Sequence, residues 1–97
     1  MPYIIPEKRE KLDPIVEDLI CALTELQSGE GKDNMEGNLN YVFSKVLAEL
    51  YVENYGDINS AIGLLNCIAL EFYTRVAVPY EAQKAFENGD VYNNGSI

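Results

Sequence analysis

Four residues in the last third of the sequence combine the two properties that bind a nucleotide. Tyr73 and Tyr80 offer flat aromatic faces on which a base can stack. Arg75 and Lys84 are cations that bind phosphate or carboxylate. Because these four residues lie close together in an otherwise acidic chain, they predict a pocket for a small anion or nucleotide.

Local ion pairing is the alternative interpretation of these two cations. Glu71 precedes Arg75 by four residues and Glu81 precedes Lys84 by three, which are the spacings at which side chains meet on a helix. The tyrosines then need no ligand, because tyrosine is also common at the edge of a hydrophobic core. The sequence alone leaves both interpretations open.

A second set of candidate binding residues comprises Asn40, Tyr41 and Asn59. Asn40 and Asn59 fall near the starts of two predicted helices. There an asparagine either satisfies backbone groups at the helix end or lines a site between helices. We therefore keep this set as a second candidate for the ligand site.

No residue predicts catalysis, a metal or a cofactor. The chain has no histidine, so the common nucleophile–base pairs and thiolate–histidine metal sites are excluded, and it has no phosphate-binding glycine loop. Paired carboxylates leave one minor alternative, an all-α metal-dependent nucleotide pyrophosphohydrolase. Its candidate pairs are Glu7 with Glu10, Glu49 with Glu53, and Glu87 with Asp90.

The charge of the chain restricts its partners. Sixteen acidic and seven basic residues give a formal net charge of -9, which repels nucleic acids and anionic membranes. This charge either keeps a small protein soluble or makes the surface an acidic decoy for a basic site on a partner. The start of the chain is polar and no apolar run reaches the length of a membrane span, so we expect a cytoplasmic protein.

Helix-start and helix-stop signals predict an all-α fold. Asp13 can cap a first helix that has Pro14 at its first position and ends near Ser28 and Gly29. The residues before it, 1–12, are predicted to form an N-terminal arm. A second helix is expected from about Glu36 to Asn54.

The third helix is predicted from about Ile58 to Val78. Gly56 as a left-handed stop and Asp57 as the next cap leave a joint so short that the second and third helices form an antiparallel hairpin. Pro79 ends or kinks the third helix. A short last helix over Tyr80–Glu87 stops at Asn88 and Gly89, and residues 90–97 form a flexible tail.

The third helix is the apolar centre of this prediction. One stripe contains Ile58, Ile62, Leu65, Ala69, Phe72 and Val76, and further apolar residues spread beyond it. We therefore predict a single helical domain over residues 1–97, a small bundle built on the long hairpin and assembled as a homo-oligomer. The alternative is that the first helix and the termini cover the third helix.

Several short motifs resemble a family of small phage, prophage and bacterial proteins that is catalogued as a domain of unknown function. They are Gly37–Tyr41, Tyr55–Asn59, Leu70–Arg75, Pro79–Glu81 and Asn88–Tyr92. The sequence departs from the family pattern at Thr74, where a second basic residue is expected, which weakens the argument for a strongly cationic pocket.

The resemblance implies a phage setting and transfers no functional residue. Small, oligomeric helical phage proteins often counter host immunity. The most specific expectation is therefore a non-enzymatic homo-oligomeric sponge that sequesters a small nucleotide-derived host immune signal. The alternative is an acidic inhibitor or scaffold that acts on a host protein.

Overall fold

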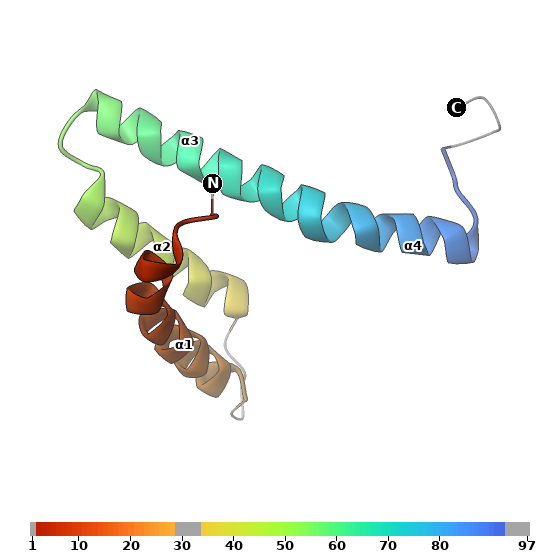
Figure 1. The fold of residues 1–97 in the computed structure, drawn as a ribbon, viewed down its shortest axis with the longest axis horizontal. Helices are drawn as coiled ribbons and strands as arrows, with labels where there is room; N and C mark the ends of the chain where they lie inside the picture. The colour runs from red at the N-terminus through yellow and green to blue at the C-terminus, as the bar shows by residue number, and fades with distance from the viewer. Residues whose placement is uncertain (1, 29–33, 93–97) are drawn as a thin grey trace. The chain divides into compact units, whose positions relative to one another are not determined.

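A computed structural model describes residues 2–28 and 34–92, all of whose regular elements are helical. The order is α1 (Pro6–Ser28), α2 (Met35–Leu50), α3 (Tyr55–Phe72), a π-helical turn η1 (Tyr73–Ala77) and α4 (Val78–Asn88) (Figure 1). The predicted all-α class is confirmed. The hairpin, the single domain and the oligomer stay predictions.

Helix α1 begins at Pro6, eight residues before the start at Pro14 that a cap at Asp13 predicts, so the predicted start is wrong. The backbone N–H groups of Lys8 and Arg9 donate to the Ile5 carbonyl at 3.1 and 3.3 Å, which starts the first turn. The Arg9 Nε–H also donates to the Ile4 carbonyl at 2.7 Å. Glu, Lys and Arg favour helices, so residues 6–12 join the helix instead of forming part of an arm, and Pro14 lies inside it. The predicted helical course from Pro14 to Ser28 is confirmed.

Helix α2 is capped by Asn34, whose Oδ1 accepts from the backbone N–H groups of Glu36 at 2.8 Å and Gly37 at 3.4 Å. The helix ends at Leu50, four residues earlier than predicted. The Tyr51 N–H donates to the Leu47 carbonyl at 2.9 Å and closes the last turn. The predicted loop before α2 falls mostly on residues 29–33, which lie outside the described residues.

The joint to α3 differs from the prediction because Asn54, not Asp57, caps the helix. The Asn54 Oδ1 accepts from the Asp57 backbone N–H at 2.9 Å. Gly56 therefore lies within the first turn of α3 and is not a left-handed stop. Among the described residues, only Gly89 has a positive φ, at 93°.

Pro79 does not end the third helix. The helical run continues from Tyr55 to Asn88 over 34 residues, through η1 and into α4 (Figure 1). In η1 the Val78 N–H donates to the Tyr73 carbonyl, five residues back. A proline ring clashes with the carbonyl four residues before it in a regular α-helix. The wider turn just upstream relieves this clash, and Gly89 then ends α4 as predicted, with its N–H donating to the Ala85 carbonyl at 2.9 Å.

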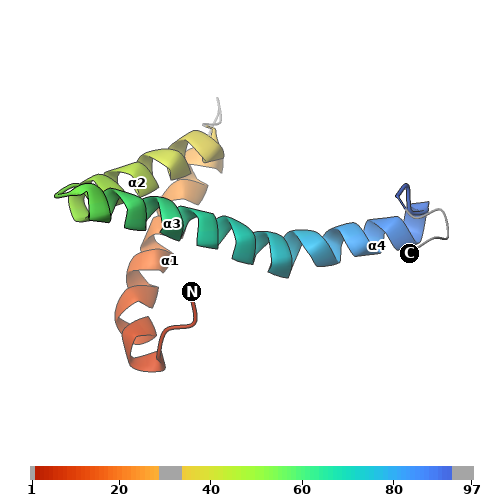
Figure 2. The same ribbon diagram turned by 90° about the horizontal axis from the view of Figure 1, so that it is seen from above.

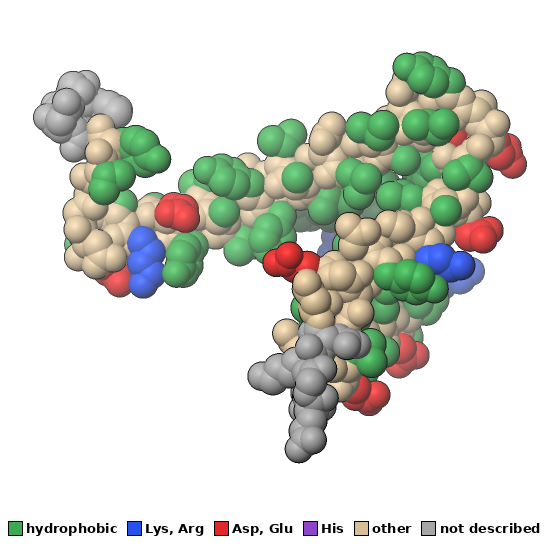
Figure 3. All heavy atoms as spheres, turned by 180° about the vertical axis from the view of Figure 1, so that it is seen from behind, with side chains coloured by type: hydrophobic (Ala, Val, Ile, Leu, Met, Phe, Trp, Pro, Cys, Tyr) green, Lys and Arg blue, Asp and Glu red, His purple; other side chains and the backbone are tan. Residues whose placement is uncertain are grey.

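The chain divides into two units, residues 2–61 and residues 62 onward. In the first unit α1 and α2 contact each other where they cross (Figures 1 and 2). The described part of the second unit is the remaining helical run up to Asn88, followed by residues 89–92. Leu23, at 6% exposure, is the one hydrophobic residue that the described chain buries, and hydrophobic side chains lie open along α3 and α4 (Figure 3).

The cap of α3 gives a first prediction. Asn54→Ala should lower the free energy of unfolding by about 0.5–2 kcal/mol, because it removes the acceptor for the Asp57 N–H. Asn54→Asp keeps an acceptor at the same place and should leave stability nearly unchanged. Urea unfolding followed by circular dichroism measures both. If Asp57→Ala lowered the free energy of unfolding more than Asn54→Ala does, Asp57 would be the capping residue of α3.

Candidate functional site

The first candidate set lies along one helical run. Tyr73 and Arg75 belong to η1, and Tyr80 and Lys84 belong to α4. Both tyrosines are exposed, so their aromatic faces are accessible to a ligand. Residues two apart on a helix do not face each other, so Tyr73 and Arg75 point in different directions.

Tyr80 and Lys84 are the two members that the structure brings together. The Lys84 Nζ lies 5.7 Å from the centroid of the Tyr80 ring, within the range of a cation–π interaction. This contact follows from their four-residue spacing on α4. It provides one aromatic face and one cation on the same side of the helix.

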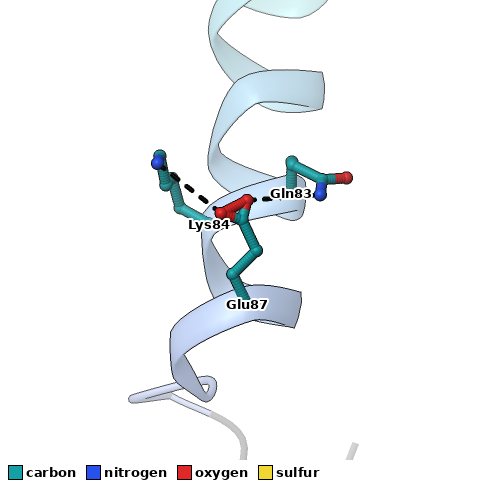
Figure 4. Close-up of polar contacts among 3 residues, drawn as sticks. All are labelled: Gln83, Lys84 and Glu87. Atoms are coloured by element: carbon teal, nitrogen blue, oxygen red, sulfur yellow. Dashed lines mark hydrogen bonds and ion pairs between the residues drawn. The ribbon is translucent and has the colours of Figure 1, made fainter.

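Lys84 also forms an ion pair, but with a different partner from the one the sequence suggested. Its Nζ lies 3.7 Å from the Glu87 Oε1, and Gln83 donates to the other oxygen of Glu87 at 3.3 Å (Figure 4). Glu81 is therefore not the partner of Lys84. Arg75 makes no ion pair within the described part of the chain.

The second candidate set is divided. Asn40 and Tyr41 line a shallow, open depression near the start of α2, together with Asn34, Glu36, Gly37 and Ser44. The Ser44 hydroxyl donates to the Asn40 Oδ1 at 3.0 Å, which fixes the amide in this depression. Asn59 lies on α3 and does not line it.

Asn38, beside this depression in sequence, was not among the predicted site residues. Its side-chain Nδ2 is buried and has no hydrogen-bond partner within the described residues. Leaving a buried donor unsatisfied costs about 1–3 kcal/mol. The repeated asparagines at 38 and 40 were visible in the sequence, but burial of one amide depends on packing and was not predictable.

Two of the three carboxylate pairs of the enzyme alternative are divided between a helix and the residues that follow it. Glu49 lies in α2 whereas Glu53 lies beyond its end, and Glu87 lies in α4 whereas Asp90 follows its stop. Glu7 and Glu10 do share α1. Within residues 2–28 and 34–92 no three acidic or cysteine side chains converge on a metal-sized site.

Comparison with known proteins identifies the family. The sequence pattern of the Domain of unknown function (DUF6899) matches residues 1–91. The chain belongs to this family. The resemblance to a family of unknown function is thereby confirmed, and the DUF6899 pattern covers both candidate sets of binding residues. No curated protein and no solved structure matches the chain significantly.

The Lys84–Glu87 pair gives a second prediction. Its side chains are 46% and 42% exposed, so water screens the pair and Glu87→Gln should lower the free energy of unfolding by only about 0.2–1 kcal/mol. Glu81→Gln makes the same charge change on α4 and should have a smaller effect. Urea unfolding in low salt and in 1 M NaCl measures both. If Glu87→Gln still destabilised the protein more than Glu81→Gln in 1 M NaCl, the result would contradict an ionic origin.

Proposed function

We propose that the protein is a non-enzymatic binding protein that works as a homo-oligomer assembled through the helical run Tyr55–Asn88. The observation that carries this proposal is the exposure of the large apolar side chains along that run, from 36% at Leu64 to 87% at Phe86, whereas Leu23 is the one hydrophobic residue that residues 2–28 and 34–92 bury. Each exposed apolar side chain loses the burial energy of about 1.5–3 kcal/mol that a core would give it.

A second copy of the chain is the simplest partner that would cover these exposed apolar side chains. A domain of about this size has little hydrophobic reserve of its own, and association adds a core from surfaces that already exist. The proposal retains antiparallel packing of α2 with α3. The short connection between Leu50 and Tyr55 supports it, because short connections favour antiparallel neighbours.

The most specific form of the proposal is a phage-type sponge for a small nucleotide-derived host immune signal. It is supported by the stacking face and cation at Tyr80 and Lys84, with Tyr73 and Arg75 on the same run. Because Tyr73 and Arg75 point apart, one helix cannot gather all four residues. A neighbouring copy would have to complete the pocket. The net charge of -9 favours a small ligand over a long polyanion.

A second candidate function is inhibition or scaffolding of a host protein through the acidic surface. The excess of sixteen acidic over seven basic residues favours it, because such a surface suits a basic partner. This function needs no small-molecule pocket. A ligand titration therefore separates the two candidates.

Self-association gives a third prediction. Size exclusion with light scattering should show at least a dimer at micromolar concentration. Leu64→Glu should abolish the dimer, because the interface would bury an unpaired charge, and Leu70→Glu tests a second position on the same run. Asn66→Glu adds the same charge at a polar position between them and should stay associated. A monomeric wild-type protein would remove the premise.

The ligand gives a fourth prediction. Calorimetric titration with cyclic and ADP-ribose-type nucleotides should detect binding, and Arg75→Ala and Lys84→Ala should each weaken it by about 1.5–3 kcal/mol, the range for hydrogen bonds to charged groups. Lys45→Ala, which removes a cation from α2, is the control. No binding by the wild type would favour the protein partner. Binding that survives both substitutions would move the site toward Asn40, Tyr41 and Asn59.

A further inference from the structure

The helical run has a charge pattern that is complementary to itself. Between residues 58 and 80 the chain has two charged residues, Glu71 and Arg75, of opposite sign and four positions apart. They lie about one helical turn apart and therefore on the same side of the helix. Leu64 and Ile68 precede Glu71 by seven and three residues and so share that side.

The position of this pair along the helix matters as much as its charge. Residue 73 lies midway between Glu71 and Arg75. The run extends from Tyr55 to Asn88, so residue 73 is also close to its midpoint. Two copies crossing at residue 73 with opposite chain directions would overlap along nearly the whole run.

We infer that a second copy of this chain packs antiparallel on the helical run, with the twofold axis beside residue 73 and Glu71 of each copy next to Arg75 of the other. The inference rests on the self-association proposed above and names its geometry. Antiparallel pairing about this point forms two opposite-charge contacts. Parallel pairing in register would instead place Glu71 beside Glu71 and Arg75 beside Arg75, which is destabilising.

Both charged groups can take part in such contacts. Arg75 makes no ion pair within the described residues, and its guanidinium has five N–H donors. Glu71 is partly buried and already makes an interaction within its own chain. Its carboxylate has two oxygens with about four acceptor sites, so it can accept from Arg75 of a second copy as well.

A lipid bilayer is the competing cover for this helix. Contrary to the expectation that no apolar run reaches the length of a membrane span, the run Tyr55–Asn88 is long and apolar enough to cross a membrane by length and composition. A bilayer would place Glu71 and Arg75 near the middle of the span, where charged groups are costly. A second copy gives each charge a partner and covers the same apolar side chains, so we favour the second copy.

Charge variants test the pairing. Glu71→Arg leaves two cations on this side of the helix and Arg75→Glu leaves two anions, so each variant alone should dimerise at least about tenfold more weakly than wild type. An equimolar mixture of the two should recover wild-type affinity. The double variant Glu71→Arg/Arg75→Glu should also recover it, since the pattern is again self-complementary. Circular dichroism checks that each single variant remains helical.

Cysteine cross-linking tests the direction. Cys21 and Cys67 are both free and exposed and can be replaced by serine. In that background Leu64→Cys and Ala82→Cys lie at equal distances from residue 73. A mixture of the two should form a disulfide between unlike chains under mild oxidation. Leu64→Cys alone should not cross-link to itself.

The outcomes separate this inference from the proposed function. If both single charge variants dimerised as tightly as wild type, or if the Leu64→Cys protein cross-linked to itself, the antiparallel arrangement would be overturned. Self-association would still stand. A monomeric wild-type protein would overturn both. Flotation of the wild type with phosphatidylcholine vesicles, without dimerisation, would identify the bilayer as the cover. Heterodimer recovery together with the unlike-chain disulfide would establish the arrangement.

Discussion

The constraint on which the rest of the structure depends is the shortage of buried apolar surface. Residues 55–88 form one helical run whose large apolar side chains are exposed, and the described chain buries one hydrophobic residue, Leu23. Helices gain most of their stability from packing an apolar face and little from intrinsic propensity. The position of every candidate site residue on this run therefore depends on what covers the run.

Local sequence signals predicted the helical fold. They also predicted a helix end correctly where a single stop signal was present. Asn88 before Gly89 ended α4 as predicted. The predictions were wrong where two residues could play the same role. Asn54 and Asp57 can both cap a helix, and a hydrogen bond to the Asp57 N–H decides for Asn54. Pro14 and Pro79 both lie inside helical runs. A π-helical turn, Tyr73–Ala77, precedes Pro79, and a residue preference does not specify such a turn.

The candidate site was predictable only as far as helical spacing reaches. Tyr80 and Lys84 meet because they are four residues apart on α4. Tyr73 and Arg75 were grouped with them because they are near in sequence. Pro79 does not end the helix, so all four residues lie along one helical run. The pairing of Lys84 with Glu87, and not with Glu81, depends on a choice between two neighbours with equal spacing.

Arg75 connects the proposed assembly to the proposed ligand. If Glu71 of a second copy pairs with it, a phosphate must either displace that carboxylate or bind the remaining guanidinium donors, since arginine carries five. Displacement would make nucleotide binding and dimerisation oppose each other, with the same coupling free energy measured from either side. Shared donors would instead place the ligand against the interface, beside side chains from both copies. A single helix cannot form a pocket alone. In that arrangement two copies would form the pocket together, and Arg75 would be part of it.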